Sequence, residues 1–573
     1  MRTGGRIVAA ARHVSDLGDP QMDDPAAESL ITVAGGAGQV WRIAEAGPYG
    51  DGARHPWNRG IDLELLAGVA PAGQTIAIHL GDPGGGCPGY RCQSFAEKRF
   101  GFRLGVLPAP GEPWRVEPES ESAGAEIVGG AAVGLRVVVT QPTKRGAPRR
   151  VTIKPEDAYG NVAGPPAGTV RLLLDEAVPL ADVDCQGGRA EEVVLDLPAD
   201  EGVRRLTAAG DDGRLFARSN PFGSSPVEGM DLFWGEIHAQ SGLCDGTNDP
   251  ADLYDYARNA AGLDFAAVTS HDFELTDDDW RRIRQATRDA HRPGRFVTFL
   301  GYEWSGGSAK GGDNNVYFLG DDGPLLYCNP FGGYPEWDPS CGATAGADRT
   351  VSDLADALRR RGAMIVPHCG GRRCNLDFHD GNLMPMIEIH SCHRTYEDVA
   401  FEAIGRGLRV GFIGGSDDHR GAIGDSRPAA RERYFSARSG LVGAWAKRLT
   451  REALWEAFFA RRVYATNGPR IVLDVRARDD ETGDGVFMGG ELRTRPGRRV
   501  TLRFVTWLDG LLGRIVLLEG DRVIRRFDPP ANQVPQFQAE HAIEVEPGRH
   551  AFWLRVRQSD GGTAWSSPIW IVA

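Results

Sequence analysis

Histidines and carboxylates recur at the ends of predicted strands in the middle of this 573-residue chain. The first pair is Glu236 and His238, in the segment 231–241, whose apolar residues predict a buried strand. Side chains two residues apart on a strand point to the same side, so this carboxylate and imidazole face one pocket. A strand that ends with two potential ligands is a common start of a metal site, but the pair is weak evidence alone.

Five further segments place similar groups after a predicted strand. They supply His271 and Asp272 after Thr269, Glu303 after Leu300, His368 after Pro367, His390 and His393 after Ile389, and Asp417 and His419 after Ile413. In parallel α/β architectures the carboxyl ends of the strands face one common crevice. We therefore expect all six segments to deliver their groups to the same end of one domain.

This set of groups predicts a metal centre. Imidazole and carboxylate without a thiolate pair suit zinc, manganese or iron, whereas an oxygen-only magnesium or calcium site would not need the histidines. So many ligands exceed one tetrahedral site and predict two or three divalent metal ions per chain, with Glu303 as the natural bridging carboxylate. Metals about 3.5–4 Å apart can hold a hydroxide between them and polarise the scissile group of a substrate. No Gly-x-Ser-x-Gly nucleophile motif competes for this role.

The residues around these groups alternate between predicted strands and helices. Helix starts are predicted at Asp249, at Thr276, in 350–353 and in 395–398, because a capping residue stands at each. Between them lie predicted strands over 265–269, 296–300, 364–367, 386–389 and 410–413. Repeated strand-then-helix units predict a parallel sheet, either open or closed into a barrel.

The rest of the chain is predicted to be β-rich. Short β-like runs between Gly and Pro turns predict an N-terminal β domain over 1–125, and a second set predicts an immunoglobulin-like β domain over 126–225. The segment that carries the histidines and carboxylates is predicted as a domain over 226–468. A third β set predicts a C-terminal β-sandwich domain over 469–573.

Composition and charge argue against several classes of protein. The net charge of −13 disfavours a nucleic-acid or anionic-membrane partner, and no apolar run reaches the length of a membrane span. Residues 1–20 lack the apolar core of a secretory signal, so a cytoplasmic protein is expected. Nine cysteines without a doubled Cys-x-x-Cys framework predict mostly free thiols, and a Cys328–Cys341 or Cys369–Cys374 disulfide stays open.

The motifs resemble those of a known superfamily. Glu236-Ile-His238, Thr269-Ser-His271-Asp272, Gly301-Tyr-Glu303, Pro367-His368 and Asp417-Asp-His419 look like the successive motifs of the PHP (polymerase and histidinol phosphatase) superfamily. More narrowly, the segments 233–238, 315–318, 387–393 and 415–421 resemble a branch that includes carbaryl-hydrolase-like carbamate hydrolases. Members of that branch also carry β domains around the PHP core.

The resemblance implies a multidomain protein with a distorted (β/α)7 barrel over roughly 226–468, flanked by all-β, sandwich-like domains at both ends. It implies a first metal held by Glu236, His238, Glu303 and Asp417. Glu303 and His368 would hold the second metal, with His393 as the better-placed partner because His390 stands where the branch usually has an aromatic residue.

Two further implications concern residues around these ligands. His271 and His419 would serve a third metal or contact the substrate. Asp272 is a candidate to orient a ligand histidine, and the alternative is an ordinary acidic residue at the start of a helix. Glu236 stands where the superfamily usually has histidine and the branch aspartate, and Asp313 stands where the branch tends to have a histidine. Aspartate can still bind a metal, so Asp313 stays among the predicted ligands.

The sequence therefore predicts a metal-dependent hydrolase in which a metal-bound hydroxide attacks an ester-like small molecule. Phosphoester hydrolysis is the preferred class, and carbamate or carboxylic ester hydrolysis is the alternative. A second alternative is a non-catalytic binding protein with a degenerate PHP scaffold, which the departures at Glu236 and Asp313 favour. The sequence leaves open whether the chain forms a homo-oligomer.

Overall fold

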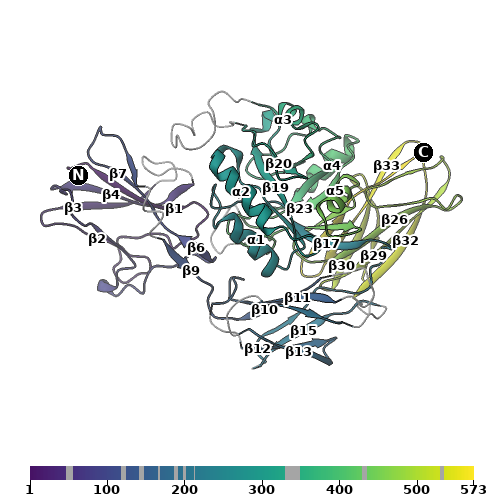
Figure 1. The fold of residues 1–573 in the computed structure, drawn as a ribbon, viewed down its shortest axis with the longest axis horizontal. Coiled ribbons are helices and arrows are strands. Elements are labelled where there is room, and N and C mark those ends of the chain that lie inside the picture. The colour runs from purple at the N-terminus through teal and green to yellow at the C-terminus, as the bar shows by residue number, and fades with distance from the viewer. Residues whose placement is uncertain are drawn as a thin grey trace. The chain divides into compact units, whose positions relative to one another are not determined.

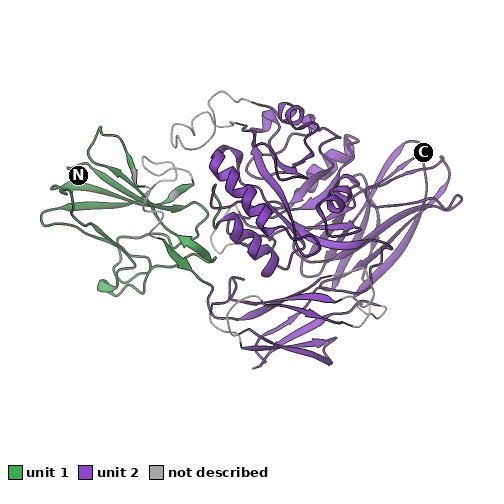
Figure 2. Cartoon of the chain, in the orientation of Figure 1, with its two compact units in different colours: residues 1–128, 244–248, 429–433 green, residues 129–243, 249–428, 434–573 purple. Residues whose placement is uncertain are grey.

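The computed structural model describes residues 1–46, 56–117, 124–140, 148–164, 168–185, 191–197, 202–211, 213–328, 349–428, 435–529 and 535–573. Two compact units divide the chain (Figure 2). The first unit comprises 1–128, 244–248 and 429–433, and the second comprises 129–243, 249–428 and 434–573. The division into four domains is finer than this and stays a prediction.

The first unit is built of strands, as the Gly- and Pro-punctuated β runs predict (Figure 1). Its strands are β1 (Arg6–Arg12), β2 (Ile31–Ala34), β3 (Val40–Ala46), β4 (Trp57–Ala67), β5 (Ala77–Leu80), β6 (Glu97–Phe100), β7 (Arg103–Leu107), β8 (Arg115–Glu117) and β9 (Ala125–Ile127). The main sheet has the order β3-β4-β1-β7-β8. Alternate residues Ile61 and Leu63 of β4 are buried against Ile31, which is the pattern of a sheet with one covered face.

The second unit begins with two small sheets that share one apolar core. One sheet has the order β10 (Gly134–Val139), β11 (Arg149–Glu156) and β14 (Glu191–Leu195). The other has the order β13 (Val178–Asp184), β12 (Thr169–Leu174), β15 (Leu206–Gly210) and β16 (Phe216–Arg218). Val137 and Ile153 of the first sheet lie in one buried cluster with Val170 and Leu172 of the second. Two sheets with a common core form a sandwich.

The strand-and-helix part of the second unit follows. Its strands are β17 (Asp231–Glu236), β18 (Phe265–Val268), β19 (Val297–Ser305), β20 (Asp313–Phe318), β21 (Ala363–Pro367), β22 (Met386–His390), β23 (Gly411–Gly414), β24 (Leu441–Ala446) and β25 (Val463–Thr466). Its α-helices are α1 (Pro250–Asn259), α2 (Asp277–Ala290), α3 (Val351–Leu358), α4 (Glu397–Gly405) and α5 (Arg451–Phe459). The predicted capping residues Asp249, Thr276 and Thr350 each accept a hydrogen bond from a first-turn amide. The sequence did not predict α5.

Strand pairing in this part departs from the predicted parallel order. β17, β18 and β19 pair in parallel, but β20 pairs antiparallel with both β19 and β21. The connection from Ser305 to Asp313 is too short for a helical crossover, so the chain must return in the opposite direction. β22 and β23 form a separate parallel pair. Among the described strands the pairing is therefore not a closed ring, and the (β/α)7 barrel is not shown.

Six of the ten C-terminal strands continue the same sheet. The ten strands are β26 (Val472–Asp479), β27 (Gly485–Phe487), β28 (Glu491–Arg493), β29 (Arg499–Trp507), β30 (Leu512–Glu519), β31 (Arg522–Phe527), β32 (Gln536–Glu544), β33 (Arg549–Gln558), β34 (Thr563–Ser566) and β35 (Ile569–Val572). β25 pairs with β34, so one 13-stranded sheet joins the strand-and-helix part to the C-terminal part. A second sheet, β27-β26-β29-β32, shares a buried cluster with it.

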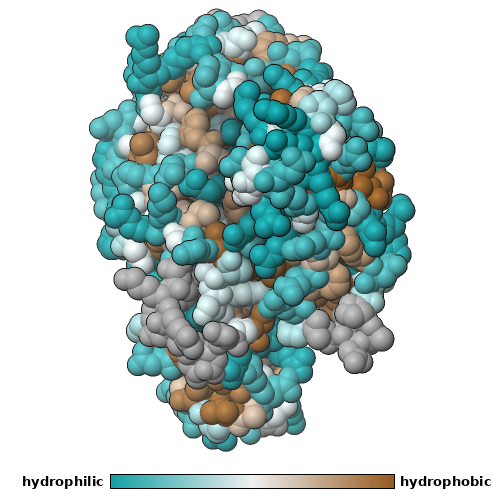
Figure 3. Space-filling model, turned by 90° about the vertical axis from the view of Figure 1, so that its right-hand side faces the viewer, coloured by the Kyte–Doolittle hydropathy of each residue, from teal (hydrophilic) through white to brown (hydrophobic). Residues whose placement is uncertain are grey.

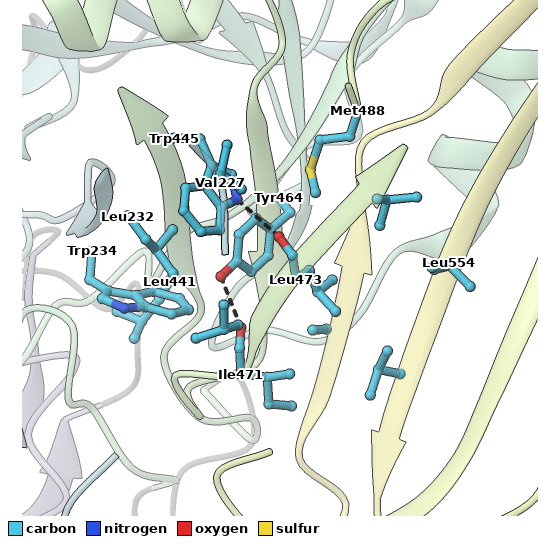
Figure 4. Close-up of a cluster of buried hydrophobic side chains, with 14 of the residues drawn as sticks. Val227, Leu232, Trp234, Leu441, Trp445, Tyr464, Ile471, Leu473, Met488 and Leu554 are labelled. Atoms are coloured by element: carbon cyan, nitrogen blue, oxygen red, sulfur yellow. Dashed lines mark hydrogen bonds between the residues drawn. The ribbon is translucent and has the colours of Figure 1, made fainter. Parts of the chain in front are cut away.

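Two buried aromatic side chains tie these parts together (Figure 4). Trp445 Nε1 donates a hydrogen bond of 2.9 Å to the carbonyl oxygen of Leu473, and the Tyr464 hydroxyl donates one of 2.9 Å to that of Ile471. Both rings lie in the largely apolar cluster that also contains Trp234. When the polar atom of a buried aromatic side chain is hydrogen-bonded, the bond sets the orientation of the ring while the core buries its apolar surface.

The face of the molecule drawn in Figure 3 is mostly hydrophilic, with apolar residues in scattered groups. None of the helices in the described part of the chain is both long and apolar enough to cross a membrane.

A buried lysine links the sandwich to the segment that follows Asp417 and His419. Lys154 on β11 is 0% exposed, contacts Asp425 and lies 2.9 Å from Glu156 Oε1. Arg136 on β10 also pairs with Asp425. Burial by itself would lower the pKa of the Lys154 amine, but Asp425 holds it above its ordinary value. The lysine is therefore charged and compensated.

We expect Lys154→Met to lower the free energy of unfolding by about 3–5 kcal/mol, because it leaves a buried carboxylate without one of its counter-charges. Arg171→Met is the matched control, since it breaks an exposed pair with Asp182 and should leave the free energy of unfolding nearly unchanged. Urea unfolding measures both. Equal losses in the two variants would contradict the role of Lys154.

Candidate metal centre

Five of the predicted ligand side chains meet in one buried cluster, and Glu303 is common to its two halves. His238, Glu303 and Asp417 form one group that could hold a metal ion, and Glu303, Asp313 and His368 form another. The ligand atoms within each group lie within 4.8 Å of one another. We call these five residues the ligand cluster.

The strand ends explain why these residues converge. His238 follows β17, His368 follows β21, Asp417 follows β23, and Glu303 lies near the end of β19. Asp313 is the first residue of β20 and pairs with Ser305 at the end of β19. Because β20 runs in the opposite direction, its beginning lies at the same edge of the sheet as the ends of its neighbours.

Glu303 directs its two oxygens at different histidines. Its Oε2 lies 3.3 Å from His238 Nε2 and 3.3 Å from His271 Nδ1, while its Oε1 lies 3.4 Å from His368 Nε2. Burial would raise the pKa of Glu303, but His271 and His368 bring it well below its usual value. Glu303 is therefore an ionised carboxylate in the position of a bridging ligand.

His238 is oriented by Glu388, a residue that the sequence prediction missed. His238 Nδ1 lies 3.0 Å from Glu388 Oε2, and Nε2 lies 3.3 Å from Asp417 Oδ1. With the proton of Nδ1 donated to Glu388, Nε2 presents a lone pair to the cluster, which is how a carboxylate commonly orients a metal-binding histidine. A Cβ on Gly415 would lie 2.0 Å from Glu388 Oε2, so the glycine makes room for this contact.

The cluster meets the requirements of a bound cation. In the part of the chain that the structure describes, both ring nitrogens of His368, Oδ1 of Asp417 and Oε2 of Glu236 are buried without a hydrogen-bond partner. Burying a polar atom without a partner destabilises the folded protein, unless a bound ion or another group interacts with that atom. Burial would lower the pKa of His238, but Glu388 and Asp417 raise it well above its usual value. The ligand cluster favours positive charge, and its imidazole and carboxylate donors suit divalent metal ions.

Arg372 lies beside the group of Glu303, Asp313 and His368 and already pairs with Asp313. Its Nε donates to Asp313 Oδ1 at 2.5 Å and its backbone N donates to Oδ2 at 2.7 Å, so both oxygens of Asp313 already accept hydrogen bonds. The guanidinium also lies 4.0 Å from Glu303 Oε1. The half of the cluster that contains Asp313 thus carries a fixed positive charge next to it.

Of the remaining predicted histidines, His393 and His419 lie next to the ligand cluster, and His390 is engaged elsewhere. His393 Nε2 lies 2.9 Å from Asp417 Oδ2, and His419 Nδ1 lies 2.8 Å from the backbone oxygen of Asp417. The ring of Phe435 packs against both, with centroids 5.1 and 4.7 Å away. His390 instead contacts the Thr395 hydroxyl through Nδ1 and the Arg438 carbonyl through Nε2. The structure thus brings His393, and not His390, to Asp417.

Glu236 and Asp272 bind backbone amides beside the cluster. Glu236 Oε1 accepts from the amides of His238 and Ser416, and Asp272 accepts from those of Ser305 and Cys328. Burial raises the pKa of Glu236 to about 8 and that of Asp272 to about 6. Within the described residues, Glu236 belongs to none of the three-ligand groups. The bonds of Asp272 secure the end of β19.

The two disulfides left open by the sequence differ in outcome. Cys369 and Cys374 are free thiols with their sulfurs 3.7 Å apart. Cys328 is a free buried thiol, and Cys341 lies outside the described residues.

We expect Glu388→Gln to weaken metal binding by about 10–100-fold, because the amide cannot hold the Nδ1 proton of His238 as a carboxylate does. His390→Gln is the control, since His390 has both nitrogens engaged away from the cluster. Competition with a chromogenic chelator measures Zn²⁺ affinity. The assignment fails if the His390 variant loses affinity and the Glu388 variant does not.

His390 also predicts a pH dependence. Burial lowers its pKa from 6.5 to about 4, so the unfolded chain takes up this proton first as the pH falls. The stabilisation is complete above the unfolded pKa and is lost as the pH falls toward the folded pKa. Between about pH 7 and about pH 4, the native protein should lose about 3 kcal/mol more unfolding free energy than His390→Gln. Denaturant titrations at both pH values measure the difference, and parallel losses would contradict it.

Comparisons with known proteins add relatives but no assigned activity. The family model described as a protein of unknown function, DUF3604, matches residues 410–486. An uncharacterized protein of Chlamydia pneumoniae is 24% identical over 548 residues, covering 87% of this chain and 84% of that one. One of Chlamydia trachomatis is 23% identical over 545 residues, with the same two coverages.

Among solved structures, the chain is similar to a two-domain protein from Bacteroides vulgatus, described as containing a predicted PHP-like metal-dependent phosphoesterase. The identity is 14% and the TM-score 0.34, with 60% of this chain and 97% of that chain covered. At that TM-score the likeness carries no argument about this chain.

Proposed function

We propose that the protein is a metal-dependent hydrolase of ester-like small molecules. The observation that carries the proposal is Glu303, a buried carboxylate shared by two adjacent ligand groups. A carboxylate common to two sites suits a centre of two neighbouring metal ions, which is the arrangement that clamps the attacking and leaving oxygens of a substrate. The PHP-type barrel implied by the sequence motifs is part of the same proposal.

In this proposal the five residues of the ligand cluster hold two divalent ions, with zinc, manganese and iron as the metals that suit imidazole and carboxylate donors. Glu236 adds its unpartnered Oε2, and His393 adds its ring beside Asp417. When bound, such ions polarise an ester oxygen and make water a nucleophile near neutral pH.

The chain's own residues orient the ligands and handle protons. Glu388 keeps the lone pair of His238 Nε2 directed into the cluster, and Phe435 packs against His393 and His419. His271 and His419 have ring centroids 6.1 Å apart beside the cluster. We assign to these two imidazoles the transfer of a proton to the leaving oxygen. Asp272 supports this arrangement by holding the amides of Ser305 and Cys328.

Phosphoesters are the preferred substrates. The motifs resemble a superfamily named for a phosphatase, and the Arg372 guanidinium near Glu303 suits an anionic group. Carbamates and carboxylic esters are the alternative. The pairing of Arg372 with Asp313 favours the second alternative, a non-catalytic scaffold, because it competes with a metal for Asp313.

We expect turnover of p-nitrophenyl phosphate or of bis(p-nitrophenyl) phosphate with Mn²⁺ or Zn²⁺, and a loss of more than about 100-fold in kcat/KM in Glu303→Gln together with a fall in metal content. Glu491→Gln is the control, since its carboxylate on β28 pairs with Arg493 of the same strand and with Arg409, which lies between α4 and β23. Elemental analysis and initial rates are the measurements.

Other results of these measurements would favour one of the alternative functions. Hydrolysis of p-nitrophenyl acetate or of a p-nitrophenyl carbamate without hydrolysis of the phosphorus compounds selects the carbon-centred alternative. Less than about one metal per chain, with no turnover of any substrate, selects the scaffold. Full metal content and rate in Glu303→Gln would remove the basis of the proposal.

A further inference from the structure

A hollow of about 840 Å³ lies on the C-terminal strands, and none of the ligand-cluster residues lines it. Its walls come from β30, β31, β33 and β34 and from the start of α4. The strands contribute four arginines: Arg514, Arg526, Arg555 and Arg557.

The strand register places all four arginines on one face of the sheet. Arg514 of β30 lies directly opposite Arg557 of β33, and Val516 of β30 lies opposite Arg555 on one side and Arg526 of β31 on the other. Residues opposite each other in a ladder project to the same face. Like charges placed directly opposite are unfavourable, so the arrangement costs stability unless an anion offsets it.

The protein itself compensates this charge only in part. Arg555 NH1 lies 2.5 Å from Glu397 Oε2, and the other oxygen of Glu397 accepts a hydrogen bond from Trp565 Nε1. Arg514 lies 3.5 Å from Asp528, but both side chains are more than half exposed, so this pair contributes little. Throughout the described ranges, neither Arg526 nor Arg557 forms an ion pair.

Two polar amide side chains of the lining are already engaged. Gln558 Oε1 accepts from the amides of Asp509 and Gly510, and Asn467 binds Gly561 and Thr563. Recognition in the hollow therefore depends mainly on guanidinium groups, which bind phosphate and carboxylate through paired hydrogen bonds.

We propose that the hollow is a binding site for a compact multivalent oxyanion, a small molecule with two or more phosphate or carboxylate groups held by Arg514, Arg526 and Arg557. Its volume lies in the range of small-molecule sites. The net charge of −13 disfavours an extended polyanion such as nucleic acid, because that would lie against the acidic remainder of the surface. The proposal does not depend on the activity of the metal centre.

Isothermal titration calorimetry of the full chain with inorganic pyrophosphate and with citrate tests the site. We expect binding that weakens as salt is added, and at least a tenfold rise in Kd in Arg526→Gln and in Arg557→Gln. Arg525→Gln is the matched control, because Arg525 is the adjacent residue on β31 and pairs with Leu517, which places it on the other face. It should leave Kd unchanged.

Pyrophosphate and citrate also bind divalent metal ions, so the arginine variants decide the location of the site. Binding of pyrophosphate alone assigns a phosphorylated ligand, binding of citrate alone assigns a carboxylated one, and binding of both supports any multivalent oxyanion. The proposal is overturned if neither anion binds, or if the Arg526→Gln/Arg557→Gln double variant, folded by circular dichroism, binds as the native protein does.

Discussion

A negative charge at Glu303, on a side chain that is 1% exposed, is the constraint on which the centre of the second unit depends. A buried carboxylate is tolerated only where donors or positive charges surround it. His238, His271 and His368 supply them from the ends of three strands, and Gln240 donates from 2.5 Å. The ends of these strands therefore meet around one buried charge.

Much of this arrangement could be predicted because local rules govern it. Strands of apolar residues, capped helix starts and the convergence of strand ends need only short stretches of sequence, and they located Glu303, His368 and Asp417 together. The sequence did not predict the direction of β20, because this direction depends on the length of the connection from Ser305 to Asp313. Its reversal nevertheless brought Asp313 to the cluster, since an antiparallel strand begins where its neighbours end.

The features that sequence did not predict depend on contacts between distant segments. Glu388 lies within an apolar strand, and only the position of His238, 150 residues earlier, makes its carboxylate part of the site. The difference between His390 and His393 depends on the loop that joins β22 to α4. The resemblance favoured His393 over His390, but the contacts of His390 with Thr395 and Arg438 follow no local pattern of the sequence.

The contact between Lys154 and Asp425 sets a limit on how the chain can be divided. A fragment that starts at residue 226 would keep Asp425, together with Asp417 and His419 just before it, but would lose Lys154 and Arg136. Asp425 would then lose two of its charge partners together with the side chains that cover it, next to the segment that carries the ligands. The strand-and-helix part and the sandwich are thus joined by a buried ion pair. A shorter version of the protein without the sandwich would present to water a carboxylate that the full chain keeps buried.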